Sequence, residues 1–365
     1  MIRKLLLTVS IMAIIFNARA QKNVAQLIEV VSFGKNQPIG VKLAPASNRL
    51  FVSFPHHEPF LYALTEIING ERVPYPDTTW NEYTPDEPDT HFVSVQDLYT
   101  DDRNFLWVLD SSPAGAAAVI GNNTNTTGKF KLVKIDLSDN QVKRIYNFDD
   151  LPKDKSALND VRVDNNRHLA YLSDPGLHAI VVLDLNTGKS RIVLQDDKST
   201  VIQPGFVLHI DDKDVVDTSG KPFTSAVNGI ALTADDQYFY FRAINQTKLY
   251  RIPTVYLADI NMPEAILSSK VEMIAETGVC HGMIADKQGN IYLSDSPDHA
   301  IQYVSPDGKV HFLVKDERII WPDSFGIGND GYVYFSCSQM NRLPKYNNGK
   351  DMVEYPFRVY KVKLP

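Results

Sequence analysis

Short stretches of alternating polar and apolar residues recur along the chain, separated by turns rich in Asp, Asn and Gly. Residues 158–194 show the pattern in full: NDVRVD alternates, HLAYLSD is a strand-like segment bounded by turn formers, AIVVLDL is an apolar run typical of a buried strand, and KSRIVL follows an Asn-Thr-Gly turn. This succession predicts a four-stranded antiparallel meander. One twisted sheet has two faces and cannot bury both alone, so the unit predicts neighbours of its own kind.

The first half of this unit, a strand, a polar turn and an aromatic-rich strand, occurs six times. Six such four-stranded antiparallel blades closed in a ring form an all-β, six-bladed β-propeller, and we expect 21–365 to make this one domain. The segment LIEVVSF at 27–33 has no partner of its own, so we expect it to add a strand to the last blade and close the ring. The six copies begin at Pro38, Val95, Leu158, Val227, Cys280 and Pro322.

The first twenty residues have the pattern of a targeting segment. Arg3 and Lys4 precede the apolar run LLLTVSIMAIIF, and 18–20 supply a small-x-small cleavage site. About a dozen apolar residues fall short of the ~20 that span a bilayer. We therefore expect 1–20 to be a signal peptide and the mature chain to be secreted or periplasmic, with no membrane span.

Composition and net charge limit the classes of molecule that the protein can bind. With 44% hydrophobic and 22% charged residues, the 365-residue chain can bury a large core. The formal net charge of −7 argues against nucleic acid, whose phosphates require a basic surface, and favours neutral or cationic partners. No GxSxG, HExxH or P-loop motif occurs in the sequence. We expect a monomer that binds a small molecule.

Candidate binding residues follow from the propeller geometry. The first strand of each blade lines the central channel, and antiparallel pairing brings its start and the end of the second strand to one face. Many of these positions are acidic, so we predict an acidic funnel edged by aromatic side chains, although any single Asp there can instead cap a turn. The inner candidates are Asp97, Asn159, Asp160, Asn228, His281 and Asp323; the outer ones are Phe54, Asp110, Asp174, Arg242 and Asp295, with Trp321 at the edge.

Three of these residues are candidates for catalysis. His281 begins an innermost strand next to Asp323 of the following blade, and imidazole titrates near neutral pH, so this pair suits acid–base work. A structural histidine bonded to a backbone carbonyl is the equal alternative. Arg242 is the cation of the outer ring; it either clamps a substrate carboxylate or neutralises neighbouring aspartates.

Cys280 and Cys337 are the only cysteines of the chain. Cys280 begins the inner strand of the fifth blade, and Cys337 ends the second strand of the sixth, which places both at one mouth on adjacent blades. An oxidising compartment permits a bond between them. We predict a disulfide, with two buried free thiols as the alternative.

Several segments carry a family resemblance. PYPDTTWN, QDLYTDDRNFLWVLD, KLVKIDLSDNQVKRIYNF, NDVRVDNNRHLAYLSD and WPDSFGIGNDGYVYFSCSQMNRL, in this order, resemble the Yellow/major royal jelly protein family. The resemblance covers nearly the whole mature chain. It implies a propeller whose channel mouth holds small aromatic amines, and in some members a link to the conversion of dopachrome-type intermediates by isomerisation.

A more distant resemblance points to metal chemistry. NDVRVD, VNGIALTADD and PDSFGIG are similar to the first strands of gluconolactonase/regucalcin-like propellers, which use a central metal. Asn159, Asn228 and Asp323 match ligand positions of those relatives, and such oxygen ligands suit calcium or another divalent cation. However, Ile39 stands where the relatives carry a Glu, which removes one carboxylate from the shell.

Two functional classes therefore remain open at the level of sequence, with a third beside them. The first is a Yellow-type binding protein with isomerase activity as an option, and the second is a metal-dependent lactonase-like hydrolase. The third is a protein-interaction platform, which an exposed apolar patch away from the funnel would indicate.

Overall fold

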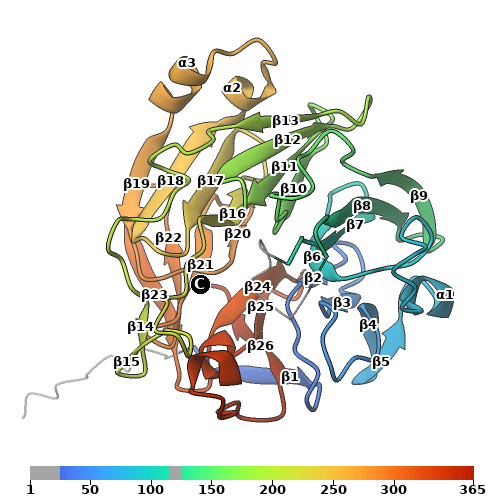
Figure 1. The fold of residues 1–365 in the computed structure, drawn as a ribbon, viewed down its shortest axis with the longest axis vertical. Coiled ribbons are helices and arrows are strands. Elements are labelled where there is room, and N and C mark those ends of the chain that lie inside the picture. The colour runs from blue at the N-terminus through green and yellow to red at the C-terminus, as the bar shows by residue number, and fades with distance from the viewer. Residues whose placement is uncertain (1–24, 116–124) are drawn as a thin grey trace, which may run out of the picture.

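The computed structural model describes residues 25–115 and 125–365, so the predicted signal peptide at 1–20 lies outside the described residues. The described chain forms six four-stranded antiparallel sheets around a central axis, which confirms the predicted six-bladed β-propeller (Figure 1). No helix in these two ranges has the length and hydrophobicity needed to cross a bilayer.

Each blade runs from an inner to an outer strand. Blade 1 contains β2 (Val41–Leu43), β3 (Leu50–Ser53), β4 (Leu64–Ile68) and β5 (Glu71–Pro74); blade 2 contains β6 (Val95–Thr100), β7 (Phe105–Ser112), β8 (Lys129–Asp136) and β9 (Gln141–Tyr146); blade 3 contains β10 (Val161–Asp164), β11 (Leu169–Asp174), β12 (Ala179–Asp184) and β13 (Ser190–Val193).

The second half of the chain repeats this order. Blade 4 contains β16 (Val227–Leu232), β17 (Tyr238–Ala243), β18 (Lys248–Pro253) and β19 (Glu272–Glu276); blade 5 contains β20 (Met283–Ala285), β21 (Ile291–Asp295), β22 (Ala300–Val304) and β23 (Val310–Lys315); blade 6 contains β24 (Pro322–Ile327), β25 (Tyr332–Cys337), β26 (Arg358–Lys363) and β1 (Ile28–Ser32).

The ring closes through its two ends. The N-terminal strand β1 pairs antiparallel with the C-terminal strand β26, with Ile28 opposite Lys361 and Ser32 opposite Arg358. This pairing confirms the closure predicted for 27–33. It also satisfies the backbone groups of β26 that would otherwise form an exposed edge.

The core is divided into one hydrophobic cluster per seam between blades. Trp107 and Leu132 of blade 2, for example, pack against Val161 and Leu172 of blade 3. Corresponding clusters fill the other five seams. Every blade therefore buries both faces against its neighbours, which is why the isolated repeat unit required copies of itself.

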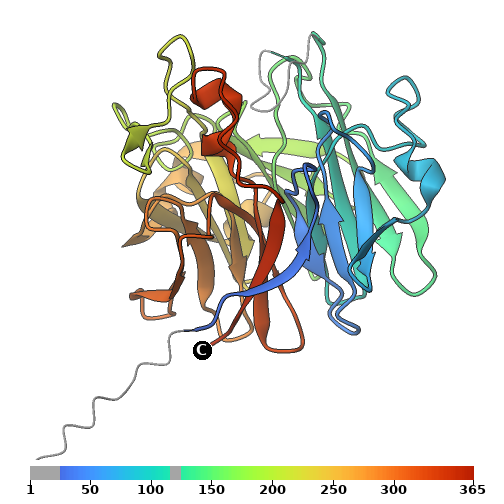
Figure 2. The same ribbon diagram turned by 90° about the horizontal axis from the view of Figure 1, so that it is seen from below.

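Longer connections project from one face of the ring, at the top of Figure 2. They include the insertion between blades 3 and 4, with β14 (His209–Ile210) and β15 (Lys213–Asp214), and the segment with η1 (Met340–Arg342) and η2 (Pro344–Tyr346). A further hydrophobic cluster joins these two segments over blade 6. The short helices are α1 (Thr78–Asn81), α2 (Thr254–Ala258) and α3 (Glu264–Ser269).

Candidate functional site

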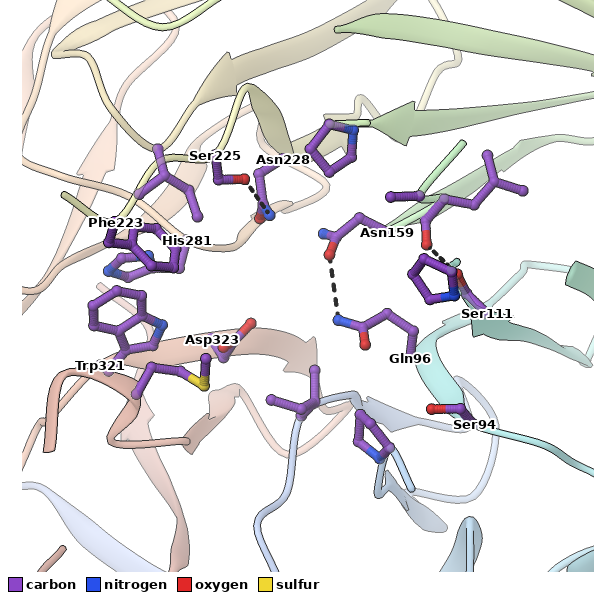
Figure 3. Close-up of a pocket in the computed structure, with 18 of the residues that line it drawn as sticks. Ser94, Gln96, Ser111, Asn159, Phe223, Ser225, Asn228, His281, Trp321 and Asp323 are labelled. Atoms are coloured by element: carbon purple, nitrogen blue, oxygen red, sulfur yellow. Dashed lines mark hydrogen bonds between the residues drawn. The ribbon is translucent and has the colours of Figure 1, made fainter. Parts of the chain in front are cut away.

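A cavity of about 800 Å³, counting the space open at its mouth, lies at the centre of the ring (Figure 3). All six blades contribute to its lining, and so do the insertion before β16 and the η1 segment. Binding sites are commonly concave, with apolar walls and a few polar groups that converge from separate elements. We call this cavity the axial pocket.

One column of the sequence repeat supplies a ring of side chains to the axial pocket. Aligning the six inner strands places one lining residue of each blade at the same position, so the ring is a direct product of the repeat. We call these residues the axial ring: Ile39, Gln96, Asn159, Asn228, His281 and Asp323.

Irregular pairing turns three of these side chains toward the axis. The register between first and second strands shifts between Val95 and Asp97 in β6, between Val227 and Ile230 in β16, and between Pro322 and Phe325 in β24. Gln96, Asn228 and Asp323 lie within these interruptions. A bulge bends its strand and re-aims a side chain, and bulges are common next to functional sites.

Serine side chains fix the axial ring from blade to blade. Ser53 Oγ donates to the carbonyl oxygen of Gln96 at 3.2 Å, and Ser173 Oγ donates to that of Asn228 at 2.7 Å. Ser336 Oγ makes the same bond to the carbonyl oxygen of Ile39 at 2.6 Å. Each serine therefore ties its own blade to the ring residue of the next.

One wall of the axial pocket is aromatic. The ring of His281 stacks on that of Trp321, with centroids 3.9 Å apart and an interplanar angle of 17°, and Phe223 meets Trp321 edge-on at 5.2 Å. Ile244 and Met340 extend this apolar wall. Figure 3 shows the wall facing the amides of Gln96 and Asn159 across the cavity.

His281 lacks the hydrogen bonds that a buried imidazole normally makes. Its side chain is 2% exposed, and neither ring nitrogen has a hydrogen-bond partner among the described residues. Burial, followed by the nearby Arg242 charge, lowers the pKa of His281 well below its usual value. The imidazole is therefore neutral at pH 7, with one N–H to donate and one nitrogen to accept. An unpaired buried polar group costs free energy that a ligand can recover.

Asp323 is the carboxylate of the axial ring. Its Oδ2 accepts a hydrogen bond from Ser338 Oγ at 2.9 Å. Burial raises its pKa to about 7, opposed by the Ser338 bond and assisted by the negative charge of Asp97. Near neutral pH this carboxyl group thus holds a proton part of the time and can both give and take one.

A buried ionic cluster lies one to three residues further along the same inner strands. Asp97 accepts from Arg162 Nη1 at 3.0 Å and lies 3.6 Å from Lys42 Nζ. Arg162 also donates to the carbonyl oxygen of Met283 at 2.9 Å, and Lys42 donates to Ser324 Oγ at 3.0 Å. The cluster joins five blades, so it ties the inner strands together beside the pocket.

Asp160 belongs to this cluster rather than to the pocket lining. Its Oδ2 lies 3.9 Å from Arg162 Nη2, and its Oδ1 accepts from Asn159 Nδ2 at 2.9 Å. Burial and the charge of Asp97 raise its pKa well above the usual value. Asp97 and Asp160 therefore act on the axial ring through neighbouring groups, not through direct exposure to its cavity.

The predicted acidic funnel is wrong for the outer carboxylates, which cap loops. Asp110 accepts from the amides of Val93 at 2.8 Å and Ser94 at 2.5 Å, and it forms an ion pair with Lys131. Asp174 accepts from three backbone amides and from Ser156 Oγ. Both side chains are about 1% exposed or less. They hold the loops that enter and leave the inner strands.

The remaining outer residues also lie outside the pocket lining. Arg242 is fully buried and donates to Thr277 Oγ1 and to the carbonyl oxygen of Gln246, so it is no substrate clamp. Asp295 accepts from Gln302 Nε2 at 2.5 Å, and burial followed by Asp298 raises its pKa to about 6.

Phe54 is a core residue rather than an edge of the funnel. It packs against Phe33 with ring centroids 5.1 Å apart, and the guanidinium of Arg72 lies 4.0 Å from its ring centre. Its side chain belongs to the cluster between blades 6 and 1. Trp321, by contrast, lines the pocket as predicted.

The predicted disulfide is absent: Cys280 and Cys337 are both free and buried. Cys280 lies in the cluster between blades 4 and 5, and its Sγ donates to the carbonyl oxygen of Gly282 at 3.1 Å. Cys337 lies in the cluster between blades 5 and 6. The two thiols therefore lie on opposite sides of blade 5. Their positions in the sequence predicted the end of the blade at which each lies, but not the side toward which each side chain points.

The axial ring brings the three predicted metal ligands together but does not complete a calcium shell. Asn159, Asn228 and Asp323 all line the cavity, while Ile39 fills the position where a fourth oxygen donor is needed. Calcium takes six to eight oxygen ligands, several of them carboxylates. No group of three or more His, Cys, Asp or Glu side chains able to hold a metal occurs within 25–115 and 125–365.

Sequence reasoning missed Gln96 of the polar wall and part of the apolar wall. Gln96 occupies the same repeat column as Asn159, so aligning the six columns position by position would have selected it instead of Asp97. Phe223 and Met340 come from segments without a repeat pattern. His56, at the rim, stacks on Tyr83 at 3.6 Å.

Comparison with known proteins adds a family match and a set of similar folds. The family model described as major royal jelly protein matches residues 93–365. Comparison with curated protein sequences finds no match.

Several solved structures share the architecture. A gluconolactonase from Xanthomonas campestris is 11% identical, with 93% of this chain and 90% of that chain covered and a TM-score of 0.54. A luciferin-regenerating enzyme is 12% identical, with 93% and 95% covered and a TM-score of 0.55. A virginiamycin B lyase from Staphylococcus aureus is 12% identical, with 93% and 100% covered and a TM-score of 0.53. At these identities the likeness shows a shared fold.

Proposed function

The chain belongs to the major royal jelly protein family, and on that premise we propose that it captures a small aromatic ligand, neutral or carrying an amine, in the axial pocket. The observation that carries this proposal is the pairing of two unlike walls in one cavity. Trp321 and Phe223 offer ring contacts, and Gln96, Asn159 and Asn228 offer hydrogen bonds from three other blades. A flat ring with polar substituents matches both walls.

The charge of the pocket fits a single cationic group. Asp323 is the carboxyl group of the axial ring, and a ligand ammonium beside it would favour its ionised form. Ammonium binding at neutral pH would then displace the proton that Asp323 partly holds. Neutral aromatic ligands would bind without this proton release.

The same residues suit an isomerase acting on dopachrome-type compounds. Neutral His281 would accept a proton from a ring carbon of the ligand at its free nitrogen, while its N–H steadies a ligand oxygen. Asp323, with a pKa of about 7, would return a proton at a second atom. One proton leaves and one is added, so the ligand is rearranged without any change of oxidation state.

Export completes the proposal. The segment 1–20 has the features of a signal peptide, so we propose that the mature chain from 21 acts outside the cytoplasm, as a monomer. N-terminal sequencing of the exported protein and its size in solution test these two points. A retained N-terminus or a stable dimer would contradict them.

The decisive experiment is calorimetric titration of the mature protein with dopamine, tyramine and phenylacetate. We expect dopamine to bind, and Asn159→Ala to weaken it about tenfold, since that change removes one polar partner from the ring. Asp174→Asn is the matched control outside the pocket and should leave the affinity of the folded protein unchanged. Equal affinities of wild type and Asn159→Ala would contradict the proposal.

A chelator separates the proposal from the alternative of a calcium-dependent, lactonase-like hydrolase. That alternative uses Asn159, Asn228 and Asp323 as ligands and draws on their shared position in the axial ring. It predicts that EDTA abolishes binding and that calcium restores hydrolysis of a sugar lactone. Amine binding that is indifferent to EDTA supports the first reading.

A further inference from the structure

A second hollow in the surface adjoins the axial pocket between blades 3 and 4. Pro175 and Ser225 line both spaces. Ser225 Oγ accepts a hydrogen bond from Asn228 Nδ2 of the axial ring at 3.4 Å, and this bond is drawn in Figure 3. A ligand seated in the axial pocket therefore has one adjoining space into which a substituent can extend. We call it the side groove.

The side groove is held in shape by a tight contact between two loops. A Cβ atom at Gly176 would lie 2.2 Å from the carbonyl oxygen of Lys155, so the two backbones touch there and a larger residue would force them apart. The loop that carries Asp154 and Lys155 on the groove continues to Ala157 and Leu158 in the axial pocket. The position of the groove is thus tied to that of the pocket.

The polar side chains of the groove are available to a ligand. Among the described residues, neither Asp154 nor Lys155 makes a side-chain hydrogen bond or an ion pair, and Thr224 Oγ1 makes no hydrogen bond. His178, in contrast, already pairs with Asp196 at 2.9 Å. The groove therefore presents one acceptor-only group, one donor-only group and one hydroxyl beside the apolar face of Pro175.

This set of groups matches a vicinal diol. Each hydroxyl group of a diol both donates and accepts, so one can donate to Asp154 while its neighbour accepts from Lys155. The charges of Asp154 and Lys155 are opposite, so a neutral substituent in the groove meets no net repulsion. A charged substituent of either sign would lie near one side chain of like charge. Nucleotides and other strongly anionic tails are disfavoured for this reason.

We propose that the axial pocket and the side groove form one two-part site, and that its ligands are aromatic glycosides whose ring enters the pocket and whose sugar lies in the groove. This inference rests on the proposed function, because the ring half of the ligand is held by the axial pocket. It adds the class of substituent that the site selects.

Three probes test the inference by calorimetry on the full mature protein: hydroquinone, 4-hydroxyphenyl β-glucoside and dopamine. The glucoside is expected to bind about tenfold more tightly than hydroquinone, as one or two additional hydrogen bonds permit. In the double variant Asp154→Ala, Lys155→Ala the two phenols should bind alike, with hydroquinone unchanged from wild type. Both side chains are exposed, so the variant should fold.

Asn159→Ala is the matched pocket variant and should weaken both phenols by the same factor. A glucoside that binds no better than hydroquinone, or an advantage that survives the double variant, overturns the groove inference while dopamine binding upholds the proposed function. Failure of all three probes to bind overturns both. Thr224→Val provides a second groove variant and should reduce the glucoside advantage without touching hydroquinone.

Discussion

Asp110 and Asp174 lie in the second strands of their blades, whereas Asp323 lies in the first strand of its blade. The three carboxylates differ in their hydrogen-bond partners. The first two are saturated by backbone amides, and Asp110 has a lysine partner as well. Asp323 receives one side-chain hydrogen bond and faces a cavity. A saturated carboxylate stabilises the fold and has nothing left for a ligand, whereas an undersatisfied one costs stability and keeps its chemistry available.

The comparison separates residues that build the pocket from residues that use it. Carboxylates at the ends of the second strands hold the loops that shape the mouth, and the axial ring lines the cavity. Substitutions of the second-strand carboxylates should therefore change the free energy of unfolding. Substitutions in the axial ring should change ligand affinity and the pH dependence of stability. Three predictions probe this division.

The largest expected effect is at Asp110. Replacement by Ala leaves Lys131 buried without its ion-pair partner and frees two loop amides, so the free energy of unfolding should fall by about 3–5 kcal/mol. Urea denaturation measures this loss. The double variant Asp110→Ala, Lys131→Met should recover part of it, and a loss below about 1 kcal/mol in the single variant would contradict the role assigned to Asp110.

The second prediction concerns the pH dependence of stability, and here the substitution should favour the folded state as the pH rises. Because burial raises the folded-state pKa of Asp323 to about 7 from 3.8, the folded protein holds this proton more tightly than the unfolded chain. Its contribution to stability is therefore greatest below about pH 4 and is lost as the pH rises to about 7.

Asp323→Asn should remove that component. The free energy of unfolding of the variant, relative to that of wild type, should be higher at pH 8 than at pH 5 by more than about 1 kcal/mol. Thermal or urea denaturation at the two pH values measures this difference. Asp174→Asn is the comparison variant: burial also raises the pKa of Asp174, but four hydrogen bonds to its carboxylate oppose the shift, so its pH effect should have the same sign and be smaller. If the stability difference between Asp323→Asn and wild type does not vary with pH, the carboxyl group of Asp323 does not titrate as proposed and cannot supply the proton chemistry of the pocket.

The smallest effect is expected at Gln96. Its Nε2 donates to Asn159 Oδ1 at 3.3 Å, and both amides face the cavity. Gln96→Ala should weaken a bound aromatic amine about fivefold, the equivalent of one hydrogen bond, with the free energy of unfolding changed by less than about 1 kcal/mol. Phe54→Leu is its counterpart in the core, and should reduce stability while leaving affinity alone; the reverse result would exchange the roles of the two residues.

The repeat made the fold predictable, because strand alternation and turn residues identify each blade without reference to distant contacts. The same periodicity placed Asn159, Asn228, His281 and Asp323 around one axis, as found. It could not tell whether Asp110 and Asp174 turn toward the channel or toward a loop amide, because both choices leave the strand pattern unchanged.

Two further errors have equally specific causes. Cys280 and Cys337 were correctly placed near one face, but a bond requires both on one side of blade 5, which depends on strand register. Phe223 and Met340 were missed since the segments that carry them have no period to align. The aromatic wall was therefore visible in sequence only through Trp321.

The closure of blade 6 by both chain ends has a consequence for when the protein begins to work. Residues 358–363 follow 28–32 only after all the other blades in the chain, yet the pairing of these two segments completes the blade whose Ser336 secures Ile39. The ring of blades is therefore incomplete until β26 has been synthesised. Any ligand of the axial pocket should therefore meet the closed ring and not the nascent chain.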